Sequence, residues 1–371
     1  MSNMFDYLIW RGDLSFGNAP LCPIDALIFS MLAYMDLRKV VPADPGAEPV
    51  RLSDAVEKYF ALPGSHLPHV TGASNHVKLL RKLSESERFG GLRLFGAKRQ
   101  VNRSENMQFG AISVLLPGQN LFVAYQGTDD TLVGWKEDFM MSYECPVPAQ
   151  LSAVNYLNEV GAAYPMRRIF TGGHSKGGNL ATYAAVKSGP GVYPRIRGVY
   201  NNDGPGFCDG TLYTPEYREM RDKIHTYMPQ SSIVAVLLEH DWKHKIVVSN
   251  GTGILQHDAY TWQVRGTEFA YTEKRTAFGE KTEAVLDRFI GALSPERKRM
   301  FCEALFEILE STEKDTVSGI IRGKKQSLKQ IMKAYGDLPD DLRGALNDSV
   351  AELKKSRKAV EKAERLKKSG S

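Results

Sequence analysis

The chain has 371 residues, of which 42% are hydrophobic and 25% are charged, and these are ordinary proportions for a folded globular protein. They exclude collagen-like, coiled-coil and wholly disordered chains. The net charge is +5, and the segment from Glu352 to the end holds eight Lys or Arg against three Glu, a surplus equal to that charge. The rest of the chain is balanced, so charge gives no reason to expect nucleic acid or an acidic substrate as a partner.

The apolar stretches of the chain are short. The most apolar early run, 26–35, lies between two Asp residues and is far below the roughly 20 residues that cross a bilayer. The acidic start, 1–13, lacks a basic region followed by an apolar run, so we expect no secretory signal and a cytoplasmic protein. The cysteines lie far apart and form no C-x-x-C pair, so we expect reduced, mostly packed thiols. They are Cys22, Cys145, Cys208 and Cys302.

The first part of the chain predicts helices. Apolar residues recur at near-helical spacing over 23–37, after a proline that suits a first turn, so this segment predicts a buried helix. A segment punctuated by Pro and Gly, 41–49, separates it from a second helical stretch over 52–60. Strand signals begin only after Phe89. We therefore expect residues 1–90 to form an N-terminal helical segment packed on the core.

The middle of the chain alternates strands with helices. Two apolar runs, 111–116 and 121–125, flank the turn sequence Pro-Gly-Gln-Asn and predict a hairpin. The elements expected after it are a strand over 168–171, a helix over 176–187, and strands over 196–200, 224–228 and 245–249. Strands separated by helices indicate parallel β-α-β units and a sheet covered on both faces. We expect this α/β core to occupy 91–281.

Strand signals stop at about Thr282. The sequence Ser-Pro-Glu at 294–296 is typical of a helix start and opens an amphipathic run to about Leu309. Residues 282–371 are therefore expected to form a C-terminal helical extension that ends in the basic tail. The apolar stripe of the tail, 352–368, is thin, which favours a solvated, partly frayed helix over RNA binding and leaves a weak peripheral membrane contact as an alternative.

The strongest chemical signal is the pentapeptide Gly-His-Ser-Lys-Gly at 173–177, between an expected strand and an expected helix. In such a G-x-S-x-G turn the glycines let strand and helix approach closely, and the serine hydroxyl is exposed on a strained bend. The N–H groups at the start of the helix favour negative charge on an attacked carbonyl oxygen. We interpret Ser175 as a nucleophile, and a structural or phosphate-binding turn is the alternative.

A serine nucleophile needs a base, and in this fold class the acid and then the histidine follow it along the chain. His257 is the best candidate because it lies in a polar, Gly-containing loop, 251–260, between two strand-like runs. His225 precedes the apolar part of a strand and suggests a half-buried structural residue. His240 and His244 stand four apart, but the Glu of a helical zinc pair and a third ligand are missing, so we expect no metal.

The orienting acid is expected at Asp203, which follows the strand over 196–200 in the sequence Asn-Asn-Asp-Gly-Pro-Gly. Open parallel sheets place their active sites at the carboxyl ends of their strands, where this residue lies. An Asp that only caps a Gly-Pro turn is one alternative. Asp241 and Asp258 are the other candidate acids, and Asp258 directly adjoins His257.

Several motifs together resemble the class-3 lipases. Tyr-Gln-Gly-Thr-Asp-Asp at 125–130 and Gly-Trp-Lys-Glu-Asp-Phe at 134–139 are similar to the strand end, Trp and Asp of that family. With the pentapeptide and the pattern His257-x-x-Tyr260, the resemblance covers about 92–264. The start of the chain and the string Gly-His-Ser-Lys-Gly-Gly-Asn-Leu-Ala resemble more closely an α/β-hydrolase subfamily known as a domain of unknown function. Membership implies a mostly parallel sheet flanked by helices.

The resemblance also implies roles for individual residues. Ser175 matches the nucleophile of the family and His257 its base. Thr128 matches the residue whose backbone N–H, often with its hydroxyl, joins the N–H of Lys176 in the oxyanion hole. A lysine beside the nucleophile is uncommon in lipases, and its side chain is expected either to attract an anionic group of the substrate or to point to solvent.

The acid departs from the class-3 pattern. That family places Asp before an Ile/Val-Val-Pro run, and the corresponding place here is Ser232 in Ser-Ser-Ile-Val-Ala. A serine cannot carry the charge that stabilises an imidazolium. Asp203, one strand earlier, resembles the acid position of pancreatic-type lipases.

These patterns predict a serine hydrolase that cleaves a carboxylic, lipid-like ester through an acyl-enzyme. Ser175 would attack, His257 would transfer the proton, Asp203 would orient the histidine, and the N–H groups of Thr128 and Lys176 would hold the oxyanion. No metal or organic cofactor is required, and the expected partner is a small-molecule or lipid ester rather than nucleic acid. A thioesterase or peptidase would use the same parts. The alternative is an inactive hydrolase-fold binding or scaffold protein, which the missing class-3 acid supports.

Overall fold

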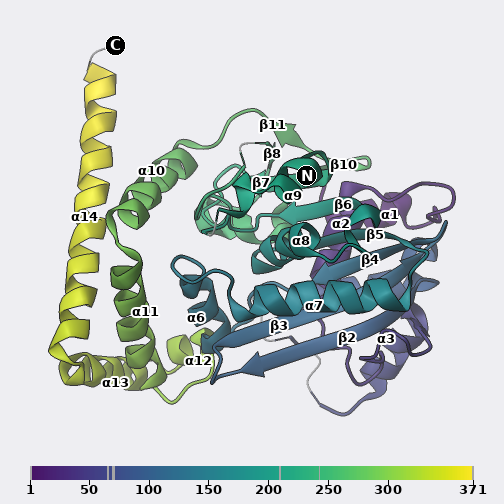
Figure 1. Ribbon diagram of the computed structural model, residues 1–371, viewed down its shortest axis with the longest axis horizontal. Coiled ribbons are helices and arrows are strands. Elements are labelled where there is room, and N and C mark those ends of the chain that lie inside the picture. The colour runs from purple at the N-terminus through teal and green to yellow at the C-terminus, as the bar shows by residue number, and fades with distance from the viewer. Residues whose placement is uncertain (1, 65–66, 69–71, 209, 242, 370–371) are drawn as a thin grey trace.

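The computed structural model describes residues 2–64, 67–68, 72–208, 210–241 and 243–369 (Figure 1). Among these residues, nine strands form one sheet in the order β1-β2-β3-β4-β5-β6-β7-β8-β11. Their bounds are β1 (Val50–Arg51), β2 (Arg93–Asn102), β3 (Met107–Leu116), β4 (Asn120–Tyr125), β5 (Arg168–His174), β6 (Ile196–Asn202), β7 (Ile224–Pro229), β8 (His244–Val247) and β11 (Tyr271–Thr272). A separate pair, β9 (Val264–Arg265) and β10 (Glu268–Phe269), lies beside it.

The central part of the sheet is parallel. Strands β4, β5, β6, β7 and β8 run parallel to one another, whereas β1, β2, β3 and β4 pair antiparallel and β11 is antiparallel to β8. The hairpin expected around 117–120 is confirmed as β3 and β4, and Gly118 supplies the positive φ of 69° in its turn. The expected strands over 168–171, 196–200, 224–228 and 245–249 correspond to β5, β6, β7 and β8.

Strand β4 shows how the core is divided between two faces. Its residues from Leu121 to Tyr125 are all buried, as a strand covered on both sides requires. Phe122 and Ala124 belong to one apolar cluster with the N-terminal helices, and Leu121 and Val123 belong to a second cluster with helices that follow β4. Successive side chains of a strand point to opposite faces, so this alternation places the sheet between two layers.

The helices of the two layers come from different parts of the chain. Figure 1 shows α7 in front of the sheet and the purple N-terminal helices on the other side. The first layer consists of α1 (Met4–Arg11), α2 (Pro23–Leu32), α3 (Leu52–Ala61), α4 (Ala73–Glu85) and α5 (Glu87–Gly90). The second consists of α7 (Pro148–Ala163), α8 (Lys176–Lys187) and α9 (Pro215–Met220). The helix expected over 23–37 ends at residue 32, and the chain to residue 37 continues through buried turns.

The register of the parallel strands brings three loops to one edge. Tyr125 at the end of β4 pairs with Gly173, and His174 at the end of β5 pairs with Asn202. The residues that follow each strand, including Thr128, Ser175 and Asp203, therefore lie at the carboxyl edge of the sheet. This edge is where open α/β sheets place their sites.

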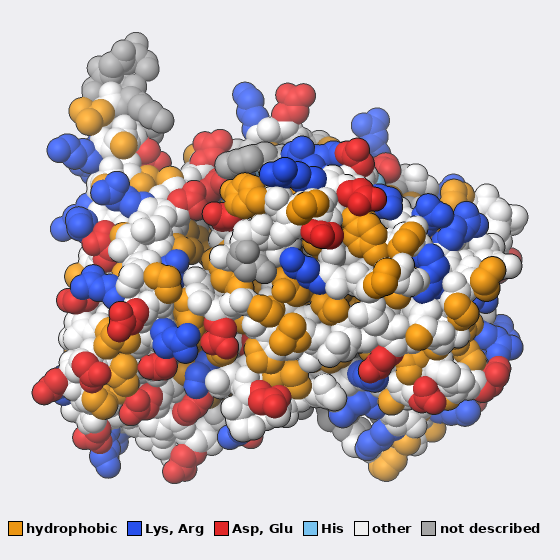
Figure 2. All heavy atoms as spheres, in the orientation of Figure 1, with side chains coloured by type: hydrophobic (Ala, Val, Ile, Leu, Met, Phe, Trp, Pro, Cys, Tyr) orange, Lys and Arg blue, Asp and Glu red, His pale blue; other side chains and the backbone are white. Residues whose placement is uncertain are grey.

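The C-terminal part of the chain is helical. It consists of α10 (Ala277–Ala292), α11 (Pro295–Glu310), α12 (Val317–Arg322), α13 (Lys324–Asp337) and α14 (Asp340–Ser369). The start expected at 294–296 is confirmed, because the Ser294 side chain accepts a hydrogen bond from the backbone N–H of Arg297. The first of these helices begins at Ala277, five residues before the expected boundary. Figure 1 shows the yellow α14 alongside α10 and α11, and Figure 2 shows acidic and basic side chains interspersed on this part of the surface.

A buried ion pair fixes the N-terminal helices. Arg88 on α5 donates two hydrogen bonds to Asp25 on α2, at 2.8 and 2.5 Å, and both side chains are almost completely buried. The remaining guanidinium hydrogens bond to the carbonyl oxygens of Leu14, Ala19 and Pro20. Burying a charge pair is favourable only when its hydrogen-bonding groups are satisfied in this way.

Substituting this arginine should destabilise the whole protein. Arg88→Met leaves the Asp25 carboxylate buried without its cation, which typically costs about 3–5 kcal/mol of unfolding free energy. The matched control is Arg93→Met, because Arg93 pairs with Glu48 at 2.8 Å but its side chain is 56% exposed. An exposed pair of this kind contributes about 0–1 kcal/mol. Urea unfolding checks both values, and equal losses in the two variants would contradict the assignment.

Candidate active site

A sharp turn joins β5 to α8. Ser175 lies between them with φ 59° and ψ −135°, which non-glycine residues rarely adopt. Its backbone N–H donates to the Asn202 carbonyl at 3.0 Å, which helps to hold the turn against β6. A Cβ on Gly173 would lie 2.1 Å from the backbone of Gly177, and a Cβ on Gly177 would lie 2.3 Å from the Tyr125 carbonyl oxygen. Both glycines are therefore required by close backbone packing.

The structure places Asp203 against His257. Asp203 directly follows β6, is completely buried and has a φ of 57°. Its Oδ2 lies 2.6 Å from Nδ1 of His257, whose side chain is 25% exposed. The hydroxyl of Ser232 donates to the other carboxylate oxygen. The serine that the sequence resemblance set at the class-3 acid position thus bonds to the carboxylate that follows the previous strand.

The other candidate acids have different partners. Asp241 binds Arg221 through two hydrogen bonds of 2.6 and 2.8 Å and also accepts one from Tyr217. Asp258 accepts a hydrogen bond from the backbone N–H of Tyr260 at 3.0 Å. Within the described residues, neither carboxylate is hydrogen-bonded to the His257 ring, so Asp203 is its acidic partner.

His174, which precedes Ser175, connects His257 to the Ser175 turn. Nε2 of His174 lies 2.8 Å from the His257 carbonyl oxygen, and the two imidazole rings are 4.6 Å apart between centroids. In the described part of the chain, the Ser175 hydroxyl makes no hydrogen bond with the His257 ring. In proteins without bound substrate, contacts between a nucleophile and its base are often long.

His174 and Tyr34 are site residues that the sequence did not identify. The Tyr34 hydroxyl lies 3.0 Å from Nδ1 of His174, and burial lowers the pKa of His174 well below its ordinary value. A neutral His174 is therefore assigned a proton on Nε2, which donates to the His257 carbonyl, while Nδ1 accepts from Tyr34. The position of His174 inside the pentapeptide was a possible signal, whereas Tyr34 lies 140 residues away in the sequence.

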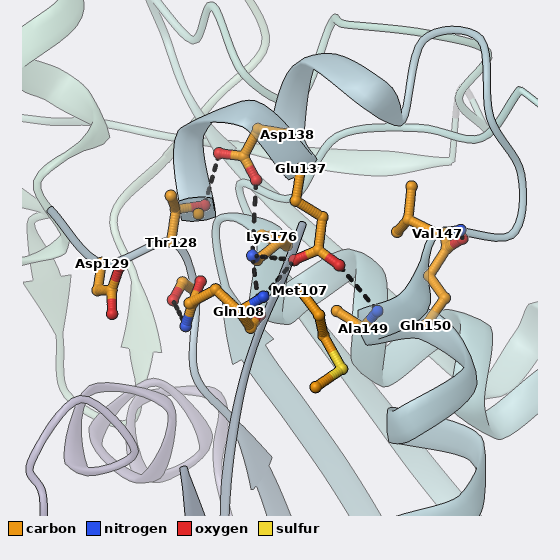
Figure 3. Close-up of polar contacts among 12 residues, drawn as sticks. Met107, Gln108, Thr128, Asp129, Glu137, Asp138, Val147, Ala149, Gln150 and Lys176 are labelled. Atoms are coloured by element: carbon orange, nitrogen blue, oxygen red, sulfur yellow. Dashed lines mark hydrogen bonds and ion pairs between the residues drawn. The ribbon is translucent and has the colours of Figure 1, made fainter. Parts of the chain in front are cut away.

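Thr128 and Lys176 lie beside α6 (Leu132–Met140), the helix that follows β4 (Figure 3). The Thr128 hydroxyl donates to Oδ2 of Asp138 at 2.5 Å. The Lys176 side chain is 1% exposed, and its Nζ donates to Oε2 of Glu137 at 2.9 Å and to the Gln108 carbonyl at 3.0 Å. The expectation that this side chain points to a substrate or to solvent is therefore wrong. The buried carboxylate of α6 satisfies it inside the protein instead.

Glu137 collects hydrogen bonds from several elements. Its Oε1 accepts from the backbone N–H of Ala149, at the start of α7, at 2.8 Å. Its Oε2 accepts from the backbone N–H of Gln108, on β3, at 3.0 Å, in addition to Lys176. This carboxylate links α6, α7, α8 and β3, which accounts for its complete burial.

The expectation of reduced cysteines is wrong for one pair. Cys145, in the segment between α6 and α7, forms a disulfide with Cys208, in the loop that follows Asp203. Their Cα atoms are 6.3 Å apart although 63 residues separate them in the sequence, so spacing alone gave no indication of the contact. Cys22 and Cys302 are free and buried, as expected.

The remaining histidines downstream of Ser175 lie away from this arrangement. His225, expected to be half-buried, is exposed on β7 and its ring lies 5.2 Å from that of Tyr200. The rings of His240 and His244 are 6.4 Å apart. Among the described residues, no group of three or more His, Cys, Asp or Glu side chains could hold a metal ion. Over the same residues, every helix is too short or too polar to cross a membrane.

A family model described as Mbeg1-like matches residues 83–307. The chain belongs to the Mbeg1-like family. The match spans the sheet from β2 to β8, both loops of the Asp203–His257 contact and most of α11. The mostly parallel sheet flanked by helices has the α/β-hydrolase type of fold that the sequence indicated, with the helical part at the C-terminus.

Among solved structures, this chain is similar to several lipases. The M37 lipase is 14% identical with a TM-score of 0.36, over 58% of this chain and 68% of that one. The Rhizomucor miehei lipase propeptide complex is 11% identical with a TM-score of 0.36, over 66% and 80%. The lipase from Rhizopus microsporus var. chinensis is 13% identical with a TM-score of 0.34, over 65% and 88%. Among curated proteins, none matches the chain.

The close backbone packing around Gly177 predicts a large effect of a single methyl group. Gly177→Ala would place a Cβ against the carbonyl of β4, and overpacking of this kind costs about 1–3 kcal/mol or more of unfolding free energy. The control is Gly336→Ala, because Gly336 lies in α13 with open space around it. That substitution should stabilise the helix by about 0.5–1 kcal/mol. If Gly177→Ala and the unsubstituted protein have the same unfolding free energy in urea, the turn is not packed as described.

Proposed function

We propose that this protein is a serine hydrolase that cleaves a carboxylic ester through an acyl-enzyme intermediate. The single observation that supports this most strongly is the 2.6 Å contact between buried Asp203 and His257. It lies at the carboxyl edge of the sheet, beside a strained turn that presents a serine. A buried carboxylate that accepts from Nδ1 of a histidine leaves Nε2 as the proton acceptor, which a serine nucleophile requires.

The proposed reaction uses three side chains in sequence. Ser175 Oγ attacks the ester carbonyl carbon while Nε2 of His257 takes the hydroxyl proton, and Asp203 stabilises the resulting imidazolium. The tetrahedral intermediate collapses to an acyl-serine, and the alcohol leaves with the proton from His257. A water molecule then repeats the attack with His257 as base, which releases the carboxylic acid and restores Ser175.

The proposed oxyanion donors are the backbone N–H groups of Thr128 and Lys176. Lys176 is the first residue of α8, so its N–H lies at the positive end of the helix dipole. Thr128 lies in the loop after β4, and its hydroxyl is held by Asp138. Two fixed donors that converge on the developing charge lower the barrier, and loss of one typically costs about 3–4 kcal/mol.

Exposed apolar side chains near His257 favour a lipid-like ester as the substrate. Ile254 and Leu255, in the same short helical turn as His257, are 63% and 62% exposed. Phe278, at the start of α10, is 51% exposed and lies close to Gly253 of this turn. An acyl chain bound against these side chains would bury their apolar surface together with its own.

The alternative of an inactive scaffold protein loses its main support. That alternative rested on Ser232 at the class-3 acid position. Since Asp203 contacts His257 and Ser232 donates to Asp203, the arrangement has a carboxylate without needing one at position 232.

Hydrolysis of 4-nitrophenyl butyrate by the full chain tests the proposal. Ser175→Ala and His257→Gln should abolish measurable turnover, because each removes one partner of the proton transfer. Asp203→Asn should reduce kcat by about 10⁴-fold, since an amide favours the wrong tautomer of the histidine. Asp241→Asn is the matched control and should keep its activity, because its carboxylate pairs with Arg221 instead.

Circular dichroism should show that every variant is folded. Full activity in Ser175→Ala, or a folded wild-type protein without turnover of acetyl to octanoyl esters, would contradict the proposal. A rise of kcat/KM with acyl chain length would support the lipid-like class.

A further inference from the structure

Lys176 connects the proposed oxyanion hole to α6. Its backbone follows Ser175, while its side chain passes through the protein interior to Glu137 and to the Gln108 carbonyl. Figure 3 shows Nζ at the centre of this network, between the carboxylates of Glu137 and Asp138. A lysine is rarely buried to this extent, and the cost of removing its charge from water is offset only where anions surround it.

The second carboxylate that faces Lys176 is the one that holds Thr128. Nζ lies 3.9 Å from Oδ1 of Asp138, while Oδ2 of the same carboxylate accepts from the Thr128 hydroxyl. Within the described residues, Oδ1 of Asp138 has no hydrogen-bond partner. The charge of Lys176 is therefore the only favourable partner of this oxygen in the part of the chain that the structure describes.

Other charged groups around Asp138 oppose its ionisation or are already paired. Glu137 precedes it on α6, and Asp129 in the loop after β4 carries a buried carboxylate that pairs with Arg99 of β2 at 3.0 Å. Lys136 pairs with Glu310 of α11 at 3.7 Å.

The Tyr34 hydroxyl stays neutral, because burial and then the charge of Asp138 raise its pKa above the ordinary value. The Asp138 side chain is 29% exposed, but its Oδ1 is buried. This burial raises the pKa of Asp138 to about 6, while Lys176 and Thr128 act in the opposite direction and Glu137 and Asp129 raise it further.

We propose that the charge of Lys176 keeps Asp138 ionised, so that Asp138 fixes Thr128 and both proposed oxyanion donors are positioned by one lysine. Its backbone supplies one donor, and its ammonium group acts through Asp138 on the residue that supplies the other. Lys176 is thus a positioning residue. The catalytic part of this inference rests on the proposed function. The link from Lys176 through Asp138 to Thr128 does not depend on it.

A purely structural role for Lys176 predicts something different. A side chain that only fills space or satisfies Glu137 would leave the ionisation of Asp138 unchanged when its charge is removed. A cation about 4 Å from a carboxylate lowers the pKa of that carboxyl by about 1–3 pH units. The titration of Asp138 therefore separates the two roles.

Carbon-13 NMR of the aspartate carboxyl groups in the full chain tests the proposal. The Asp138 signal is assigned by its loss in Asp138→Asn and should titrate with a midpoint of about 6 in the unsubstituted protein. Lys176→Met matches the length of the side chain without its charge, and the midpoint should rise by about 1 pH unit or more. Lys176→Arg, which keeps the charge, should leave it close to the original value.

Glu137→Gln provides the opposite change with a side chain of the same shape. It removes an anion beside Asp138 and leaves Asp138 as the carboxylate that faces Lys176, so the midpoint should fall. The methyl signal of Thr128 should follow the midpoint of Asp138 in every variant. The proposal would be overturned if the Asp138 midpoint were the same in Lys176→Met and Glu137→Gln as in the unsubstituted protein. It would also be overturned if the methyl signal of Thr128 did not shift as Asp138 titrates.

Ester hydrolysis separates this proposal from the proposed function. If the unsubstituted protein has no turnover, the proposed function fails, while the titrations still decide the link between Lys176 and Thr128. If it is active, Lys176→Met should lose up to about 100-fold in kcat with little change in KM at a pH between the two midpoints. Lys176→Arg should recover most of that loss. An unchanged kcat in Lys176→Met with Asp138 protonated would contradict the positioning role.

Discussion

The hydrogen bond between Asp203 and His257 is the contact on which the arrangement of the site depends. It joins the loop after β6 to a loop more than fifty residues later, and it does so at a fully buried carboxylate. The loop of His257 is fixed by further contacts, since the Trp262 indole N–H donates to the Gln256 carbonyl at 2.9 Å and the Gln256 side chain accepts from the backbone N–H of Ser231. Because Ser232 also bonds to Asp203, the three loops support one another.

The C-terminal helices stabilise the same edge of the sheet from outside. Arg275, just before α10, donates to the Ser232 carbonyl at 2.7 Å. On the other side of the site, the backbone N–H of Leu132 donates to the Asp315 carbonyl at 2.9 Å, and Ser318 on α12 bonds to Asp130. This part of the chain therefore contacts the loop of Ser232, whose hydroxyl bonds to Asp203, and also the loop of Thr128. It is thus connected both to the Asp203–His257 pair and to Thr128, a proposed oxyanion donor.

The N-terminal helices serve the site in a different way. The Arg88–Asp25 pair fixes α2 and α5 on the sheet, and the turns after α2 bring Tyr34 to His174. His174 in turn holds the carbonyl of His257. A chain of hydrogen bonds thus runs from a segment distant in the sequence to His257, the proposed base. Gly127 takes part in this packing, because a Cβ there would lie 2.2 Å from the Tyr34 hydroxyl.

Much of the fold could be predicted from the sequence, because its elements carry local signals. The hairpin of β3 and β4 has a Pro-Gly turn between apolar runs, and α8 follows a Gly-rich bend. The position of Asp203 at the sheet edge follows from its place after β6, since strand ends of a parallel sheet meet at one edge. The role of Ser232 as a donor to that carboxylate needed the structure, because a motif alone cannot show which loop its side chain faces.

What could not be predicted depends on packing between distant segments. The direction of the Lys176 side chain is decided by the buried Glu137 of α6, and nothing in the pentapeptide indicates that helix. Tyr34 and the Cys145–Cys208 bond join loops that share no local pattern. The end of α2 at Leu32 could not be predicted either, because the buried turns that follow it are as apolar as the helix itself.

Mass spectrometry of the intact protein after treatment with a fluorophosphonate probe tests the central claim most directly. The probe reacts with a serine only when a base accepts its proton, so the unsubstituted chain should gain the mass of one adduct, and peptide mapping should place it on Ser175. The Ser175→Ala variant should gain none. A folded protein that stays unlabelled, or an adduct on another residue that persists in Ser175→Ala, would contradict the claim that Ser175, His257 and Asp203 act as one triad.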